Sequence, residues 1–561
     1  MSAVSLLIAS GFALAAWLAP NHYPPWVAFH GELMMALALV VAVAGELAQR
    51  RARPEPWSPL ICVTLLVACV PLLQAAGGLV RFAGDAWVVC AYLLGFAFAQ
   101  WLGRRLANRC GPMQLAEGLA LLFVAASLAS VGLQLYQWLR LDGLGVLAVD
   151  MPPHGTPFAN LAQPNHLASL LFLGLAGVLF LFERGRIRGW VATIAVLYLE
   201  AGMALTGSRT AWLAVFVLVV ALVAARGRLG LRMTLPASLG IGAGLVAAVA
   251  MLGPANELLL LASGRSFATQ MQAGPRTLFY ATMLDAIRQQ PWFGYGWNQG
   301  LAAQWQVLDA HPSGGRLMGN SHNMLLDLMV WNGIPLALAL IAFMLWWLRQ
   351  QLGACRDVAH GFMLIAILGV LAHAMVEYPL SYAYFLLPVG VMMGALDANL
   401  LQRRKVRLPR PFVLTASVAT TALLAMIVVE YVEIESNVRT LRFETARIGT
   451  NRIESSAPDL LLLTQWQEYL RVVRVEAKPG MTSEEITSIQ DVAERFPYSA
   501  ALRQFALANA LNGRSDVAAL TLRRLCTLHS KRVCAMELHA WRKLASSEYP
   551  QLARVRLTEH P

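Results

Sequence analysis

Long apolar segments alternate with short polar segments along most of the chain. Apolar runs of this length, folded as helices, are long enough to cross a lipid bilayer. The pattern predicts about 13 transmembrane helices, at residues 3–20, 27–47, 58–77, 85–102, 113–138, 166–182, 190–206, 210–225, 234–252, 322–348, 358–378, 382–398 and 410–431. The expected fold is therefore that of an all-α polytopic membrane protein.

The pattern changes near residue 434, where charged residues become more frequent and the apolar runs shorten. The segment "FPYSAALRQFALANALNGRSDVAALTLRRLCTLH" predicts two short amphipathic helices around Asn512-Gly513. This layout is typical of a helix-turn-helix repeat of the TPR type. We therefore predict two domains: a transmembrane domain at 1–433 with a large outer loop at about 253–321, and a small helical domain at 434–561.

The composition agrees with a membrane protein. The 561 residues are 57% hydrophobic and only 14% charged, and the mean hydropathy is +0.55. These values exclude an ordinary soluble globular protein.

The net charge of +12 raises the question of nucleic-acid binding. The basic residues, however, cluster in alternate loops between the predicted helices, as the positive-inside rule requires of cytoplasmic loops. We interpret the clusters as solvated faces without chemistry and expect no nucleic-acid partner. The N-terminus is then cytoplasmic, and residues 434–561 lie on the outer side. The clusters are Arg50, Arg51 and Arg53; Arg104, Arg105 and Arg109; Arg184, Arg186 and Arg188; Arg226, Arg228 and Arg232; Arg349 and Arg356; and Arg403, Arg404, Lys405, Arg407 and Arg410.

Five further arginines fall on the outer side, where topology gives no reason for them: Arg209, Arg265, Arg276, Arg288 and Arg316. Arg209 lies in "LTGSRTAWLAV", between two apolar runs, and Ser208 can cap the helix that follows. A guanidinium beside the free N–H groups of a helix N-terminus makes an anion site. The alternative is a turn whose arginine extends to lipid headgroups.

The stretch "GNSHNMLLDLMVWNGIP", residues 319–335, places polar side chains at the start of an apolar helix. We expect His322 to begin this helix, with Ser321 or Asn320 as its cap. A neutral imidazole accepts a proton near neutral pH, so His322 suits a general base. Arginines on the same surface suit phosphate binding. The combination favours attack on a lipid-linked phosphate donor.

A second polar group lies in "LAHAMVEYPLSYAYF". His373 and Glu377 are four residues apart and are expected to share one helical face, with Tyr378 following. One interpretation is that His373 and Glu377 orient a polar group of the site or bind the acceptor or the sugar. The alternative is that they form structural hydrogen bonds. A metal site completed by His322 is disfavoured, because no Cys/His set has zinc spacing and the sequence contains no Asp-x-Asp. We expect no metal and no cofactor.

A third polar group, in "FANLAQPNHLASLLF", consists of Gln163, Asn165 and His166 around Pro164. Proline can begin a helix, and amides suit hydrogen bonding to sugar hydroxyls. A plain helix cap is the alternative interpretation.

Two cysteines, Cys526 and Cys534, lie outside the membrane part. On an oxidising side of the membrane they can form a disulfide, but the sequence leaves open whether they do. The other five are interpreted as packing residues: Cys62, Cys69, Cys90, Cys110 and Cys355.

Several of these motifs resemble one family. "SHNMLLDLMVWNGIP" resembles the His-Asn, nine residues, Gly pattern of the superfamily of O-antigen ligases and bacterial protein O-oligosaccharyltransferases, at His322, Asn323 and Gly333. "LTGSRTAWLAV" resembles its Thr/Ser-Gly-Ser-Arg segment, and "GPRTLFYATMLDAIRQQPWFGYGWNQ" resembles its arginine-containing outer loop. "HAMVEYPLSYAYFLLPVGVMMG" resembles a late span. "LAQPNHLASLL" and the outer C-terminal domain are most similar to the pilin-glycosylating PglL type.

The resemblance implies transfer of a glycan from a polyprenyl (undecaprenyl) pyrophosphate carrier to Ser/Thr hydroxyls of periplasmic proteins such as pilin. The reaction would occur on the periplasmic side of the bacterial inner membrane, without a metal, and with inversion at the anomeric carbon. His322 would be the base, and Arg209 and Arg276 would bind the pyrophosphate. Arg265 is the alternative second cation, and Asn323 would orient the donor or the helix start.

Two other functions are considered. An O-antigen ligase or polymerase would use a sugar hydroxyl as acceptor, and the residues of its site would resemble those of a protein O-oligosaccharyltransferase. A transporter of a lipid-linked or anionic substrate predicts charged residues near the midplane of several spans and often an internal repeat. The polar residues here concentrate on one face and no repeat is visible, which disfavours transport. The expected partners are a lipid-linked oligosaccharide, an acceptor protein and membrane lipid.

Overall fold

Helices make up the regular secondary structure of the computed structural model, which describes residues 2–49, 58–152, 155–261, 276–398, 409–445 and 456–557. Nine helices within these ranges are long and apolar enough to cross a membrane. Four shorter apolar helices, Ala3–Leu18, Gly189–Leu205, Val358–Ala374 and Ala383–Ala398, accompany them. These helices coincide with the segments predicted from the apolar pattern, so the all-α polytopic fold is confirmed. The number that cross the bilayer stays a prediction.

The chain divides into two compact units. The first unit falls within Met1–Val67, Tyr92–Ala273 and Ala342–Ala422, and the second within Ala68–Ala91, Gly274–Ile341 and Leu423–Pro561. Four long helices are divided between them: α3 (Pro59–Ala76), α4 (Ala83–Cys110), α13 (Met324–Ala354) and α16 (Arg410–Thr445).

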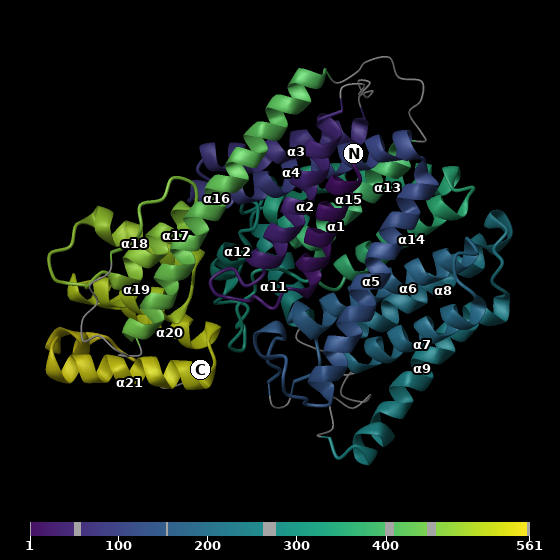
Figure 1. Cartoon of the computed structure of the whole chain (residues 1–561). Coiled ribbons are helices and arrows are strands. Elements are labelled where there is room, and N and C mark those ends of the chain that lie inside the picture. The colour runs from purple at the N-terminus through teal and green to yellow at the C-terminus, as the bar shows by residue number, and fades with distance from the viewer. Residues whose placement is uncertain are drawn as a thin grey trace. The chain divides into compact units, whose positions relative to one another are not determined.

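Most of the apolar helices lie wholly within the first unit, and Figure 1 labels them. They are α1 (Ala3–Leu18), α2 (Phe29–Leu47), α5 (Pro112–Trp138), α6 (Pro164–Glu183), α7 (Gly189–Leu205), α8 (Arg209–Leu229), α9 (Leu235–Leu258), α14 (Val358–Ala374) and α15 (Ala383–Ala398). Three short 3₁₀ helices lie between them: η1 (Gly145–Leu147), η2 (Ala159–Leu161) and η3 (Pro379–Ser381).

Helix α6 forms the core of the first unit. Every residue from His166 to Leu181 is buried, as expected of a helix that is apolar on all sides. Helices α5, α7, α8 and α14 pack around it. The approach of α5 requires a small residue, because a Cβ atom at Gly174 would lie 2.4 Å from the Ser127 Cβ.

The first unit buries some of the charges that the sequence assigns to solvated loops. Arg104 is only 1% exposed and forms an ion pair of 2.8 Å with the buried Asp397. Ser58 donates a hydrogen bond to the same carboxylate. Arg105 pairs with the buried Glu46. The interpretation as solvated faces is therefore wrong for Arg104 and Arg105. Carboxylates compensate the buried Arg104 and the largely covered Arg105, and α4 continues beyond the predicted end of its span at residue 102.

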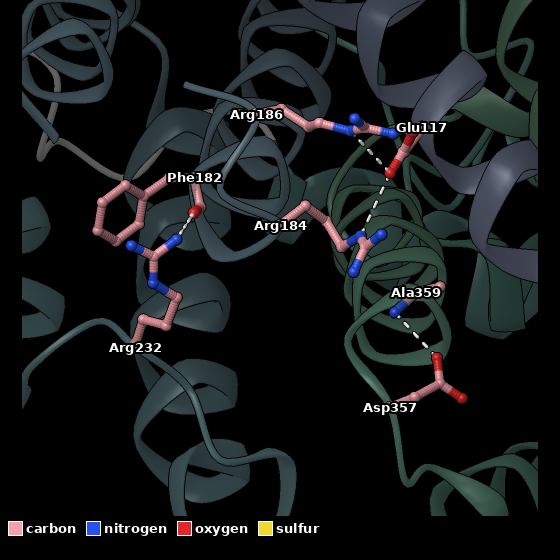
Figure 2. Close-up of polar contacts among 7 residues, drawn as sticks. All are labelled: Glu117, Phe182, Arg184, Arg186, Arg232, Asp357 and Ala359. Atoms are coloured by element: carbon pink, nitrogen blue, oxygen red, sulfur yellow. Dashed lines mark hydrogen bonds and ion pairs between the residues drawn. The ribbon is translucent and has the colours of Figure 1, made fainter. Parts of the chain in front are cut away.

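Other basic clusters of the first unit do lie at the surface. Figure 2 shows Arg184 and Arg186 both donating hydrogen bonds to Glu117 of α5. Arg232 donates to the carbonyl of Phe182, and its guanidinium lies 5.3 Å from the centre of that ring (Figure 2). These exposed arginines hold the connections at the ends of α5, α6 and α8, as solvated loop residues do.

The second unit contains α11 (Arg276–Gln289), α12 (Gly300–Val307), α17 (Thr464–Arg474), α18 (Ser483–Arg495), α19 (Ser499–Leu511), α20 (Ser515–Leu528), α21 (Lys531–Ser547) and η4 (Pro550–Arg554). The predicted pair of helices around Asn512-Gly513 is confirmed as α19 and α20. Cys526 and Cys534 form a disulfide that joins α20 to α21. The comparison with a TPR repeat stays a prediction.

The predicted loop at about 253–321 is more regular than its sequence indicates. Helix α9 extends to Leu258, and the loop contains both α11 and α12. The sequence hides these helices because tertiary packing, more than an apolar stripe of strict helical period, stabilises them. Trp305 and Leu308 of this loop belong to the same apolar core as α18 to α20.

Polar contacts also bind this loop to the C-terminal helices. Arg524 of α20 donates to Asp309 at 2.7 Å, and this hydrogen bond lowers the pKa of the Asp309 carboxyl. The Arg524 guanidinium lies 4.6 Å from the ring centre of Trp305. Ser313 and Gly315 both donate to the carbonyl of Thr527. The chain just before residue 319 is therefore held by the C-terminal helices.

The predicted domain boundary between residues 433 and 434 falls inside α16, which runs without interruption to Thr445. The compact units instead group the outer loop with the C-terminal helices. The assignment of 434–561 as a separate domain stays a prediction.

Candidate active site

The polar stretch at residues 320–323 forms a turn before α13, and His322 lies in this turn. The helix begins at Met324. Its cap is Asn323, whose Oδ1 accepts the backbone N–H groups of Leu325 and Leu326 at 3.0 and 3.2 Å. The expectation that His322 lies in the helix, capped by Ser321 or Asn320, is wrong. The Ser321 hydroxyl instead binds the backbone N–H and carbonyl of Asn323.

The turn gives His322 a left-handed backbone conformation, with φ of 60°. A buried carboxylate stabilises it: Asp327 is 3% exposed and accepts the backbone N–H of Ser321 at 2.7 Å. The same carboxylate interacts electrostatically with His322. Asp327 was not among the residues predicted from the sequence. The sequence does indicate it, because an acidic residue inside the apolar run "MLLDLMV" is energetically costly in a membrane helix and so marks a functional or structural role.

His322 shares its surroundings in the second unit with one predicted arginine. The half-buried imidazole packs against Phe279 of α11, with 5.3 Å between ring centres. Arg276 is the first residue of α11, three residues before Phe279, and residues at this spacing lie on the same helical face. The second unit therefore brings His322 and Arg276 to the same end of α11. Arg265 lies outside the described residues.

Gly333, the glycine of the His-Asn-x9-Gly pattern, marks a break in α13. Its φ of 74° interrupts the helix, and the chain at 291–296 packs directly against the break. Tyr295 N donates to the Val330 carbonyl and Ile334 N to the Pro291 carbonyl, both at 2.7 Å. A Cβ atom at Gly333 would lie 2.2 Å from the Trp292 carbonyl oxygen. Only glycine meets both the conformational and the steric requirement.

We expect Gly333→Ala to destabilise the protein and to disorder the turn that carries His322. The left-handed backbone alone costs about 1–3 kcal/mol, and the clash with Trp292 adds to it. The melting temperature of the purified protein in detergent measures the effect. Gly353→Ala is the matched control, because Gly353 lies in the same helix with no neighbouring atom within 4 Å of its added Cβ. Equal melting temperatures for the two variants would contradict this account.

Arg209 occupies the first position of α8 in the first unit. The predicted cap is confirmed: the Ser208 hydroxyl accepts the backbone N–H of Thr210 at 3.0 Å. The same hydroxyl donates to the Oδ1 of Asn165, whose Nδ2 donates to Glu377 at 2.9 Å. Three candidate segments that are distant in sequence therefore meet beside Arg209.

The relation between His373 and Glu377 differs from the prediction. Helix α14 ends at Ala374, so Glu377 lies beyond the helix and the two side chains do not share a helical face. The His373 imidazole instead contacts the Ser169 hydroxyl of α6 at 2.5 Å. Pro379 begins η3 and disfavours helical backbone at the preceding residue, Tyr378, so α14 cannot continue through this segment. The resulting turn directs Glu377 to Asn165.

The third predicted group is divided between two environments. Pro164 begins α6 as predicted, with Gln163 at the cap position. The Gln163 side chain makes no capping bond, so the plain-cap interpretation fails for it. His166 is buried, with its Nδ1 2.9 Å from the Tyr384 hydroxyl and its ring 4.3 Å from that of Tyr382. The Tyr378 ring stacks on Tyr382 with 6.0 Å between centres.

Two polar groups thus stand out. In the second unit an imidazole and a guanidinium lie at one end of α11. In the first unit a guanidinium lies at the N-terminus of α8, beside an amide and a carboxylate. A helix N-terminus with an adjacent arginine binds anions, and an imidazole can accept a proton.

Comparison with known proteins agrees with these motifs. Residues 157–182 match the family described as protein glycosylation ligase, and residues 193–341 match O-antigen ligase. Residues 362–542 match the C-terminal part of a family described as virulence factor membrane-bound polymerase.

Two curated relatives come from Acinetobacter baylyi (strain ATCC 33305 / BD413 / ADP1). The general O-oligosaccharyltransferase of this organism is 30% identical over 552 residues, which cover 95% of this chain and 94% of the relative. The ComP-specific O-oligosaccharyltransferase is 28% identical over 248 residues, covering 44% of this chain and 45% of the relative. The likeness extends over nearly the whole chain and includes each candidate segment. The chain therefore belongs to the O-oligosaccharyltransferase family of multi-pass membrane glycosyltransferases, within the O-antigen ligase superfamily.

Proposed function

We propose that this enzyme transfers a glycan from an undecaprenyl pyrophosphate carrier to Ser or Thr hydroxyls of periplasmic proteins, with pilin-like proteins as acceptors. The observation that carries the proposal is the position of His322, packed on Phe279 at the end of α11 where Arg276 begins the helix. A potential base and a potential phosphate ligand thus occupy one surface. One relative is a general O-oligosaccharyltransferase and the other is specific for ComP, and both names support a protein acceptor.

In the proposed reaction His322 accepts the proton of the acceptor hydroxyl while the hydroxyl oxygen attacks the anomeric carbon. The bond between that carbon and the pyrophosphate oxygen breaks, and the carrier leaves as polyprenyl pyrophosphate. Direct displacement inverts the anomeric centre. A positioned base contributes typically about 10²–10⁴-fold to such a step.

Charge develops on the leaving pyrophosphate, and arginines neutralise it in place of a divalent metal. Arg209 is the first cation, because it stands at a capped helix N-terminus. Arg276 is the second, with Arg265 as the alternative. Asn165 links Glu377 to Ser208 and so fixes the turn before Arg209, while Gln163, His166, His373 and Tyr378 line or support the sugar and acceptor side. Asn323 acts through the helix start that it caps.

We place the enzyme in the bacterial inner membrane with the C-terminal helices in the periplasm. The Cys526–Cys534 disulfide supports this orientation, because disulfides persist in oxidising compartments. The packing of Trp305 into the C-terminal core requires the outer loop to lie on the same side. Alkaline phosphatase fused after residue 557 should be active in cells, and activity of a cytoplasmic reporter at this position would contradict the orientation.

The proposed reaction is tested with purified enzyme, a lipid-linked glycan and two acceptors: a pilin-like protein and a lipid A core oligosaccharide. Mass spectrometry should find the glycan on Ser or Thr of the protein and unmodified oligosaccharide. Transfer to the oligosaccharide alone would identify a ligase, and elongation of the donor glycan a polymerase. Addition of a chelator should leave the rate unchanged if arginines replace a metal.

A further inference from the structure

Two aromatic side chains of the second unit are unusually exposed. Trp292 and Phe293, adjacent in "PWFGYG", have exposed fractions of 70% and 76%. The backbone on either side of them is fixed by hydrogen bonds to α13, from Ile334 N to the Pro291 carbonyl and from Tyr295 N to the Val330 carbonyl, so the exposure is not that of a loose loop. Large apolar side chains that are held together at a surface mark a site of interaction.

The height of this segment along the bilayer follows from its contacts with α3. Helix α3 is one of the helices long and apolar enough to cross a membrane, and it ends at Ala76. In its last turn the Gln74 side chain accepts the backbone N–H of Trp297 at 2.9 Å and donates to the Trp331 carbonyl at 3.0 Å. The segment at 291–297 is therefore level with the end of a membrane helix, which is where the lipid headgroups begin.

The composition of the surface fits that depth. Trp297 and Trp331 stack nearby with 5.7 Å between ring centres, and tryptophan is enriched at membrane–water interfaces. Helix α11 adds Leu284, which is 44% exposed, and the exposed Arg288. These two residues are four positions apart and lie on one helical face. An apolar face with one cation matches the boundary between acyl chains and lipid phosphates.

We propose that Leu284, Arg288, Trp292 and Phe293 form a surface that binds the lipid interface of the membrane, with the aromatic rings among the upper acyl chains and Arg288 on lipid phosphate. Backbone hydrogen bonds connect this lipid-facing surface to the C-terminal end of α11, from Gly294 N to the Gln290 carbonyl, and to the break at Gly333, from Ile334 N to the Pro291 carbonyl. The lipid contact therefore fixes the depth of α11 relative to the bilayer surface. Because Phe279 of α11 packs against His322, it also fixes the depth of His322. The lipid contact is independent of the proposed function, whereas its consequence for transfer rests on the role of His322.

A photo-crosslinking residue tests the lipid contact directly. Benzoylphenylalanine at position 293, in proteoliposomes of radiolabelled phosphatidylglycerol and phosphatidylethanolamine, should crosslink to phospholipid on irradiation. The matched control is position 536 on α21, where Met536 is 56% exposed among charged residues, and it should not label. Equal labelling at both positions, or labelling of an added acceptor protein in place of lipid at position 293, would overturn the proposal.

The double variant Trp292→Ser, Phe293→Ser tests the consequence for the reaction. Because a displacement of about 1 Å at a reaction centre can cost ~10²-fold, we expect transfer in proteoliposomes to fall by at least about tenfold. The melting temperature in detergent should not change, since both side chains are exposed. Unchanged transfer in proteoliposomes would refute the positioning role. Failure of the proposed function would appear differently, as absence of transfer by the unmodified enzyme while position 293 still labels lipid.

Discussion

Replacement of His322 by alanine should lower glycan transfer by about 10²–10⁴-fold, the contribution expected of a general base. The fold should persist, because the Ser321 hydroxyl and the Asp327 carboxylate hold the backbone of the turn by hydrogen bonds that the substitution leaves in place. His322→Gln should be equally impaired, since an amide forms hydrogen bonds but cannot accept the proton. His322→Asn is the most informative variant, because asparagine tolerates the left-handed backbone that residue 322 adopts.

The measurement is the rate of transfer to acceptor protein, with donor binding measured separately for each variant. His311→Gln is the matched control: His311 lies in the same outer loop, is half-buried and approaches Asp285 at 3.4 Å, and it has no proposed role. Near-normal transfer by His322→Gln would show that residue 322 only forms hydrogen bonds, and it would make His373 or Glu377 the next candidates. Loss of donor binding would instead assign His322 to the pyrophosphate site.

Replacement of Arg209 by alanine should lower transfer by about 10²–10³-fold, the usual effect of removing one group that stabilises developing charge. Arg209→Lys should also be much impaired, although less so. Lysine keeps the charge but loses the planar guanidinium that binds two phosphate oxygens at once. Neither substitution should disturb α8, because the helix is capped by Ser208 and not by Arg209.

Transfer and donor affinity of the Arg209 variants should be compared with those of Arg316→Ala. Arg316 is an exposed arginine of the outer loop, so its loss changes net charge equally without touching the proposed pyrophosphate site. Normal transfer by a folded Arg209→Ala enzyme would remove Arg209 from the mechanism. A similar decrease in both variants would indicate a general effect of positive charge on donor binding, and not a specific contact.

Helix positions followed from the sequence because an apolar run has few alternatives in a bilayer, where every backbone polar group must be satisfied internally. The ends were less well predicted wherever packing extends a helix past its apolar run. Helix α4 continues through Arg104 because Asp397, far away in sequence, neutralises it. Helix α16 continues to Thr445, well beyond the predicted end at residue 431.

The sequence predicted the candidate site as separate motifs, and these motifs do not predict which of the side chains contact one another. The cap of α13 was assigned to Ser321 or Asn320, because propensity does not distinguish neighbouring polar residues. It belongs to Asn323, since Ser321 is occupied by the turn and by Asp327. His373 and Glu377 were placed on one helical face, but α14 ends between them. The link from Glu377 through Asn165 to Ser208 joins three distant segments that no local pattern connects.

The sequence by itself determined the membrane fold, the family and the identity of the candidate residues, because apolar periodicity and short motifs are local properties that the chain carries in order. Tertiary structure alone decided how the residues are held. It bent α13 at Gly333, placed His322 in a left-handed turn over a buried Asp327, and packed the outer loop on the C-terminal helices. These features depend on contacts between segments up to hundreds of residues apart. Such contacts stabilise these features only after folding has brought the segments together, so no local sequence pattern encodes them.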